Sequence, residues 1–481
     1  MNLVSARALD LMLDSWRASG STPAYEALAD RIRLLILDGR IGLGTRLPAE
    51  RDLAAQLGVS RTTVTAAYAE LRERDFLSSV RGSGSVARQP HGVPAPNETA
   101  GPGILDFSKA SMPALPAVAA AAVAAAEQLP GYLGTSGFDP VGIPVLRQAI
   151  ADRYSARGLP TTPDQIMVTI GAQHAIALLS RTLLARGDRA LVETPSYPHA
   201  IEALKAAGAR LVPVAVTNDD GWDEEALEQA IQRTSPSVGY LMPDFHNPTG
   251  RSMSPELRER TLALAARHGT TLIADETMAE LGFDGPQHGL PQHSLPFAAY
   301  GESSTQAILV GSVGKTVWGG LRVGWIRADR SVIQRLIRAR SSGDLGTPAL
   351  EQLVVANLLS DYDAVLDTRR DYLRAGRDRL AGLIAAKLPE WEMPRVSGGL
   401  TAWVNLGAPV SSQLTLAARN EGLQIAAGPR FGLEGAFERF LRIPFSYPEA
   451  ETERAVDALA AAWKNVGRQA TADTGWLAEV V

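Results

Sequence analysis

The sequence predicts an α/β protein with a large, mostly parallel sheet and a smaller α+β part, preceded by a short helical module. From residue 105 to 465, short β-rich runs alternate with helical stretches, as in a parallel sheet with helical crossovers. Before residue 89, apolar residues recur mainly at helical spacing. Residues 89–104 are rich in Pro and Gly, which is typical of an extended linker. We therefore expect domains at 1–88 and 105–465, a linker at 89–104, and a tail at 466–481.

The composition excludes several kinds of site. The chain has 481 residues and no cysteine, so disulfides and thiolate metal ligands are excluded, and we expect no metal site. No apolar run reaches membrane-spanning length, and charged residues interrupt the N-terminal apolar positions. We therefore expect a cytoplasmic protein without membrane contact. Residues 1–90 hold 12 Arg and no Lys against 10 acidic residues, a weak sign of a phosphate-binding module.

The front module is predicted to be helical. A short amphipathic helix lies within residues 1–20, and a second helix begins near Pro23 and ends at 39–44. Residues 47–68 then predict helix, turn and helix. Pro48 suits a first helical turn, Gly58 permits a sharp exit, and Ser60 is a good N-cap for the next helix.

Polar side chains near the start of that last helix point outward, where a recognition helix presents base-reading groups. Two short strands are expected to follow, joined by the basic, glycine-rich turn at 81–85. The alternative is a three-helix packing module whose arginines are merely solvated. The coincidence of spacing, caps, outward Arg and Thr, and a wing-like turn favours DNA binding.

The run from Leu47 to Tyr68 and the tip at 81–84 closely resemble the GntR-type winged helix-turn-helix. The resemblance implies a double-stranded operator as partner, with Gly82 allowing close backbone approach. It does not identify the operator sequence. The positions it assigns to DNA binding are Arg51, Ser60, Arg61, Thr62, Thr63, Thr65, Arg81 and Gly82.

Six strands are predicted in the body, and a ligand site is expected at their carboxyl ends. They are Gln165–Thr169, Arg189–Glu193, Ala209–Val214, Val238–Met242, Thr271–Ala274 and Ala307–Val310.

Residues that could bind a ligand follow these strands in the sequence. Amides of 171–173 open a helix and can bind phosphate, although an ordinary strand-to-helix turn has the same pattern. Tyr197, in a turn flanked by prolines, can stack on a planar ring or simply anchor its loop. Asn247 can donate a hydrogen bond to a phenolate oxygen. Asp275 ends an apolar strand and needs a partner, either a pyridinium N–H or a structural cation.

A single lysine lies in the stretch Gly311–Trp325. Desolvated among small neighbours, Lys315 can act as an amine nucleophile toward an aldehyde. Arg322, seven residues later, can hold a phosphate bidentately. Arg442 lies in a later apolar strand and is expected to meet a carboxylate, either structural or from a ligand.

The order of these motifs resembles the fold type I aminotransferases across nearly all of residues 105–465. The resemblance implies pyridoxal 5′-phosphate (PLP) as cofactor, held as an internal aldimine by Lys315. Asp275 would pair with the pyridine nitrogen, Asn247 with the ring hydroxyl, and Tyr197 with the ring face. The remaining implied roles are phosphate binding by Gly171, Ala172, Gln173, Ser312 and Arg322, carboxylate binding by Arg442, and contact of Tyr132 with the partner subunit's phosphate.

The chain departs from the family pattern next to Asp275. Family members usually carry a tyrosine two or three residues later, which bonds the ring oxygen. Here Thr277 and Met278 stand in those places. Thr277 can replace one hydrogen bond to the cofactor but not the acidity or reach of a phenol, so efficient turnover is not expected.

A GntR-type winged helix linked to an aminotransferase-like domain is the layout of the MocR/GabR transcription regulators. The resemblance implies a head-to-tail homodimer in which each DNA-binding domain packs on the partner's large domain. It also implies PLP, or a small amino compound, as the effector that controls operator binding. The alternatives are an active aminotransferase with an appended DNA-binding module and a scaffold that has lost PLP.

Overall fold

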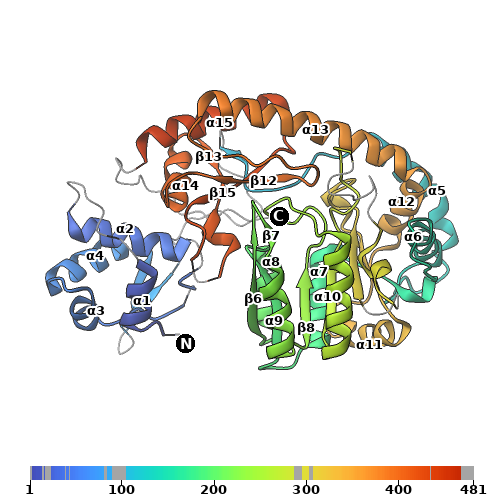
Figure 1. The fold of residues 1–481 in the computed structure, drawn as a ribbon, viewed down its shortest axis with the longest axis horizontal. Helices are drawn as coiled ribbons and strands as arrows, with labels where there is room; N and C mark the ends of the chain where they lie inside the picture. Colours follow the sequence, from blue (N-terminus) through green and yellow to red (C-terminus); the bar gives the residue numbers. More distant parts are fainter. Residues whose placement is uncertain are drawn as a thin grey trace.

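The computed structural model describes residues 3–13, 16, 23–37, 40–42, 44–80, 84–88, 104–285, 295–302, 307–433 and 435–466. The N-terminal module lies beside a larger body (Figure 1). Its elements are α1 (Ala6–Leu13), α2 (Ala24–Leu37), α3 (Glu50–Leu57), α4 (Arg61–Glu73), β1 (Leu77–Val80) and β2 (Gly84–Ala87), with β1 and β2 antiparallel. The predicted helices and the two-stranded wing are therefore confirmed.

The turn between α3 and α4 forms for the reasons that its sequence indicates. Gly58 ends α3 in the left-handed conformation, with a φ of 63°. The Ser60 hydroxyl caps α4 by accepting from the backbone N–H of Thr63 at 3.1 Å. Tyr68 is buried and donates its hydroxyl to the Pro48 carbonyl at 3.0 Å, which fixes α4 against the start of α3.

The large domain is built on a mixed sheet of eight strands within the described residues, in the order β4-β11-β10-β9-β8-β5-β6-β7. Only β11 and β7 run antiparallel to their neighbours. The six predicted strands are present, whereas β7 and β11 were not predicted. The bounds are β4 Ile166–Thr169, β5 Arg189–Thr194, β6 Arg210–Thr217, β7 Gly221–Trp222, β8 Val238–Leu241, β9 Thr271–Asp275, β10 Ala307–Ser312 and β11 Gly324–Arg327.

Helices cover both faces of this sheet. Along β9, Leu272 and Ala274 belong to one apolar core and Ile273 to the other, so the sheet separates two cores. The flanking helices are α6 (Pro144–Ala156), α7 (Gly171–Leu183), α8 (Pro198–Ala206), α9 (Glu224–Thr234), α10 (Pro255–His268) and α11 (Arg330–Arg340). Short 3-10 turns are η1 (Leu129–Gly131), η2 (Pro163–Gln165), η3 (Phe297–Tyr300), η4 (Gly319–Leu321) and η5 (Gly428–Phe431).

The chain continues through α12 (Ala349–Leu359) and the long helix α13 (Tyr362–Lys387) into a smaller α+β part. Helix α13 arches over the large domain in Figure 1. The three-stranded sheet of the smaller part has the order β12-β15-β14, and β3 pairs with β13. The remaining bounds are β3 Leu105–Asp106, α5 Ala117–Gln128, β12 Thr401–Asn405, α14 Ser411–Asn420, β13 Leu423–Gln424, β14 Ala426–Ala427, β15 Phe440–Pro444 and α15 Glu449–Asn465.

The N-terminal module contacts this small domain of its own chain. Arg31 and Arg40 approach one carboxylate, that of Glu438, with N–O distances of 3.5 and 3.8 Å. Leu416 on α14 packs against the core of the module. Glu438 also accepts from the backbone N–H of Ser412 at 3.0 Å, at the start of α14. A single acidic side chain thus joins α2 to α14.

None of the helices in the described ranges is both long enough and apolar enough to cross a membrane.

Candidate functional site

Strand register brings the predicted ligand groups together. Gly324 on β11 pairs with Thr169 on β4 and with Ser312 on β10. Asp275, at the end of β9, lies opposite Val310 of β10. Residues distant in sequence therefore meet at one edge of the sheet, as expected for the carboxyl ends of parallel strands.

The turn that enters α7, residues 170–174 (the α7 entry turn), lies against Arg322. Gly171 has a φ of 79°, and a Cβ there would come within 3.0 Å of the Arg322 guanidinium. Arg322 itself takes the left-handed conformation, with a φ of 51°, and donates to the Ile170 carbonyl at 3.2 Å. A strained non-glycine residue beside helical N–H groups is typical of a functional site and suits an anion.

Lys315 lies in the turn that follows β10. Its Nζ donates to the Ala110 carbonyl at 2.8 Å. Burial, reinforced by the nearby Arg442 charge, lowers the pKa of the Lys315 amine to about 7. A large fraction of this amine is therefore neutral and nucleophilic at physiological pH.

Three hydrogen bonds fix the orientation of the Asp275 carboxylate. Its Oδ2 accepts from the Tyr240 hydroxyl at 2.6 Å, and its Oδ1 accepts from the Thr277 hydroxyl at 2.7 Å and the Thr277 N–H at 3.0 Å. The Thr277 hydroxyl proton is thus directed to Asp275. Burial, followed by the Asp275 charge, raises the pKa of Tyr240 well above its ordinary value, so this phenol remains a donor.

The turn that carries Asn247 is anchored by a buried pair. His246 Nε2 lies 3.3 Å from Glu193 Oε2, and both side chains are fully buried. His246 Nδ1 contacts the Thr249 hydroxyl at 2.9 Å. Trp222 donates to the other Glu193 oxygen at 2.7 Å. These contacts hold the backbone on each side of Asn247.

Several of these groups line one open cavity, whose unfilled space, including the solvent at its mouth, is about 870 Å³. Tyr197, Asn247, Asp275, Thr277 and Lys315 line it. The other predicted cofactor residues on its wall are Gly171, Ala172, Gln173, Ser312 and Arg322.

Two predicted residues lie outside the wall of that cavity. Tyr132 is half-buried just after η1 and does not line its own chain's cavity. Arg442 lies behind the cavity, fully buried, with its guanidinium 4.9 Å from the centre of the Phe431 ring. Burial lowers the pKa of Arg442 to about 10.

Several buried polar atoms near the cavity have no hydrogen-bond partner among the described residues. They are Asn247 Oδ1, Gln173 Oε1, Ser196 Oγ, and Nε and Nη1 of Arg442. A buried polar atom without a partner is costly, so these atoms suit a polar ligand bound in the cavity.

The predicted DNA-contacting side chains lie on one end of the N-terminal module. Arg51, Arg61, Thr62 and Thr65 are exposed, and the Arg51 side chain keeps 85% of its accessible surface. The hydroxyls of all four predicted Ser and Thr contacts are already engaged. Those of Thr62 and Thr63 each lie 2.7 Å from the Ser60 hydroxyl. Ser60 caps α4, and Thr65 donates to Glu50 at 2.8 Å. The predicted contacts Arg81 and Gly82 lie outside the described residues.

Comparison with known proteins matches both halves of the chain. The family "Bacterial regulatory proteins, gntR family" matches residues 24–86, and "Aminotransferase class I and II" matches residues 103–459. The probable rhizopine catabolism regulatory protein MocR of Rhizobium meliloti is 30% identical, over 77% of this chain and 78% of the relative. The uncharacterized HTH-type transcriptional regulator YisV of Bacillus subtilis is 27% identical, over 91% of this chain and 95% of the relative.

This chain belongs to the MocR-type regulators.

A solved structure supports the same assignment of the body. LysN, the α-aminoadipate aminotransferase of Thermus thermophilus, was solved with N-(5′-phosphopyridoxyl)-L-leucine. It superposes with a TM-score of 0.67 at 27% identity, over 76% of this chain and 93% of that one. The MocR-type body is therefore a class I and II aminotransferase fold, a family whose members depend on PLP.

Sequence reasoning missed several residues of this MocR-type site. Ser111 and Phe245 also line the cavity. Tyr240 was missed as the partner of Asp275, although a phenol inside an otherwise apolar strand is a usable signal, because a buried tyrosine hydroxyl needs a partner. Phe245 has a φ of 45°, which no local sequence signal predicts.

Proposed function

We propose that this MocR-type chain is a DNA-binding transcriptional regulator that binds PLP in the cavity around Lys315. We further propose that PLP, or a small amino compound, is the effector that controls operator binding. The unpartnered buried atoms of Asn247 and Gln173 carry the proposal, because these residues line the same cavity as a lysine whose pKa is about 7.

The residues present fit PLP group by group. The α7 entry turn, with Ser312 and Arg322, would hold the phosphate through N–H, hydroxyl and guanidinium donors. Asp275 would hold the proton on the ring nitrogen, and Asn247 would bond the ring hydroxyl. Bound PLP supplies an aldehyde that exchanges between amines and a ring that withdraws electrons. LysN, whose structure contains a phosphopyridoxyl group, supports the same placement here.

Lys315 would provide the covalent anchor. Its partly neutral amine can attack an aldehyde without a separate base, because burial and Arg442 disfavour its charged form. An incoming amino compound would compete with this amine. Arg442, with two nitrogens free of hydrogen bonds, would take the carboxylate of such a compound.

Arg51 and Arg61 would contact the operator, with α4 in the major groove. An effector can shift this domain only if it binds two arrangements of the chain with different affinity. The contact between Glu438 and the pair Arg31 and Arg40 is the element that such a shift would alter, since it joins α2 to the small domain.

A homodimer is part of this proposal. Large exposed apolar side chains occur close together in the sequence, on α5 and in the segment after η1: Leu133 is 70% exposed, Phe138 68% and Val123 64%. Such a set is typical of a protein interface. Tyr132, next to Leu133 and outside its own cavity, is positioned for a role in the partner's site. A head-to-tail exchange of the DNA-binding domains remains a prediction.

The test combines absorbance with DNA binding. PLP added to the cofactor-free wild type should produce the visible absorbance of a lysine-bound cofactor and change its affinity for DNA from its own upstream region. Lys315→Ala should lose both responses. Arg335→Ala, on the surface of α11, is the matched control and should keep both. Unchanged absorbance in Lys315→Ala would overturn the lysine assignment, and DNA affinity indifferent to PLP and to a panel of amino compounds would overturn the effector role.

The second candidate is an active aminotransferase with a DNA-binding appendage. It is favoured by the retention of Lys315, Asp275, Asn247 and Arg322 around one cavity. Multiple-turnover transamination with keto-acid acceptors, without binding to the upstream DNA, would establish it over the regulator. We expect at most a single half-reaction, because Thr277 and Met278 occupy the positions at which the family usually carries a tyrosine.

A further inference from the structure

His174 is the last residue of the α7 entry turn and is not among the residues that line the cavity. The backbone N–H of Ile170 donates to His174 Nδ1 at 3.1 Å. Because Nδ1 accepts, the neutral ring carries its proton on Nε2. His174 Nε2 lies 2.9 Å from Asp344 Oδ2. The ring therefore bridges the first residue of the turn and a carboxylate from a distant loop.

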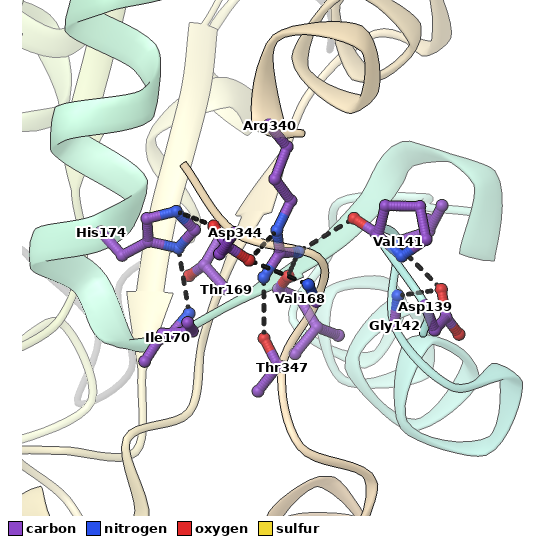
Figure 2. Close-up of polar contacts among 12 residues, drawn as sticks. Asp139, Val141, Gly142, Val168, Thr169, Ile170, His174, Arg340, Asp344 and Thr347 are labelled. Atoms are coloured by element: carbon purple, nitrogen blue, oxygen red, sulfur yellow. Dashed lines mark hydrogen bonds and ion pairs between the residues drawn. The ribbon is translucent and has the colours of Figure 1, made fainter. Parts of the chain in front are cut away.

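That carboxylate is itself held in place (Figure 2). Asp344 Oδ1 accepts from Arg340 Nε at 2.6 Å and from the Gly346 N–H at 3.0 Å. Arg340 is fully buried, and its Nη1 donates to the carbonyls of Val168 at 2.7 Å and Pro140 at 2.9 Å. Arg340 thus links Asp344 to the end of β4, the strand that leads into the α7 entry turn.

The loop that carries Asp344 has little room to move. Gly346 has a φ of 137°, and a Cβ there would come within 2.3 Å of the Asp139 carbonyl oxygen. Asp139 in turn accepts from the N–H groups of Val141 and Gly142, each at 2.9 Å. The close packing of this loop holds Asp344 in place. Asp344 in turn fixes the His174 ring, which contacts the α7 entry turn through the Ile170 N–H.

We propose that His174, as the neutral ring, is a positioning residue that sets the α7 entry turn for an anionic phosphate. The inference rests on the proposed binding of PLP and names a determinant of its affinity outside the cavity. His174 is not among the residues that line the cavity, so its effect acts through the Ile170 backbone.

Protonation would undo this arrangement. A proton on Nδ1 removes the only acceptor that the ring offers to the Ile170 N–H. Burial, followed by the Arg340 and Arg181 charges, lowers the pKa of His174 against the opposing pull of Asp344. The neutral ring therefore dominates at physiological pH and is lost as the pH falls through a pKa below the ordinary histidine value.

The experiment uses the full-length protein and PLP, with affinity measured by absorbance and by tyrosine and tryptophan fluorescence. His174→Leu keeps the bulk but neither polar contact, and it should weaken PLP binding about three- to tenfold, the effect of one lost hydrogen bond. His174→Gln offers an amide oxygen to Ile170 and an amide N–H to Asp344. It should bind PLP within about twofold of wild type at neutral pH, as expected for a retained hydrogen bond.

The pH profile separates positioning from mere packing. Titration of Lys315 affects both proteins equally, so it cancels in the ratio of wild-type to His174→Gln affinity. That ratio should fall as the pH drops through the titration of His174, because the glutamine does not titrate. A ratio constant with pH, or a His174→Leu protein with wild-type affinity, overturns the inference. If His174→Leu fails to fold, the pH ratio alone decides. Absence of PLP binding by the wild type would instead refute the proposed function.

Discussion

The amine of Lys315 should titrate near neutrality in the cofactor-free protein. Its pKa falls from 10.5 to about 7, and a shift of this size corresponds to about 5 kcal/mol of preference for the neutral amine. At pH 7 roughly half of the molecules would carry a neutral amine, against fewer than about one in a thousand for an ordinary lysine. The rate of PLP capture should therefore rise with pH and level off just above pH 7.

Stopped-flow absorbance from pH 5.5 to about 9.5 would measure this profile, a window that brackets a midpoint near 7 and ends below the reference pKa of an ordinary lysine, about 10.4. Arg442→Met is the diagnostic variant. Burial is the largest cause of the lowered Lys315 pKa and the Arg442 charge the next, so removing that charge should move the midpoint upward. A capture rate still climbing steeply at the upper end of the range in wild type would refute the assignment of a buried, partly neutral lysine.

The same shift predicts how stability depends on pH. The folded-state pKa of Lys315 lies below the unfolded value of 10.5. The unfolded chain therefore takes up a proton first as the pH falls, and stability contributed by the neutral amine is lost between pH 10.5 and about 7. Below pH 7 the contribution is constant.

Three further substitutions test the remaining elements. Arg61→Ala should weaken operator binding about tenfold at fixed salt and leave the PLP absorbance unchanged, as measured by fluorescence anisotropy. Glu438→Gln should reduce the difference in DNA affinity between PLP-bound and PLP-free protein, because the carboxylate approached by α2 loses its charge. Tyr240→Phe removes one donor to Asp275 and should shift the pH midpoint of the bound-cofactor absorbance, recorded by spectrophotometric titration.

Each of these has a contrary result, and the first two have a matched control. Arg335→Ala should leave DNA affinity intact; equal losses in Arg335→Ala and Arg61→Ala would indicate a general charge effect. Glu453→Gln, an exposed change on α15, should leave the PLP response unaltered, and an unaltered response in Glu438→Gln would remove that contact from the switch. For Tyr240→Phe, an unmoved midpoint would mean that its hydroxyl does not influence Asp275.

Much of the fold could be predicted because its signals are local. Gly58 and Ser60 encode the turn between α3 and α4 within a few residues, through a left-handed exit and a side-chain cap. Apolar runs predicted six strands of the large sheet. The antiparallel strand β11 was missed because nothing in a four-residue run states its direction, which depends on its neighbours β10 and β4.

The same distinction between local signals and long-range contacts applies to the residues of the candidate site. Lys315, Asp275 and Asn247 could be named from the sequence, because each stands in a motif and the motifs follow a recognisable order. The contacts that tune them could not. Tyr240 reaches Asp275 across 35 positions of the chain, and Asp344 reaches His174 across 170. Glu438 meets Arg31 only because the two domains pack. The order of residues alone established which chemical groups are present and which element carries each. Folding in three dimensions established which of them touch, because strand register and domain packing set those distances and no local signal does.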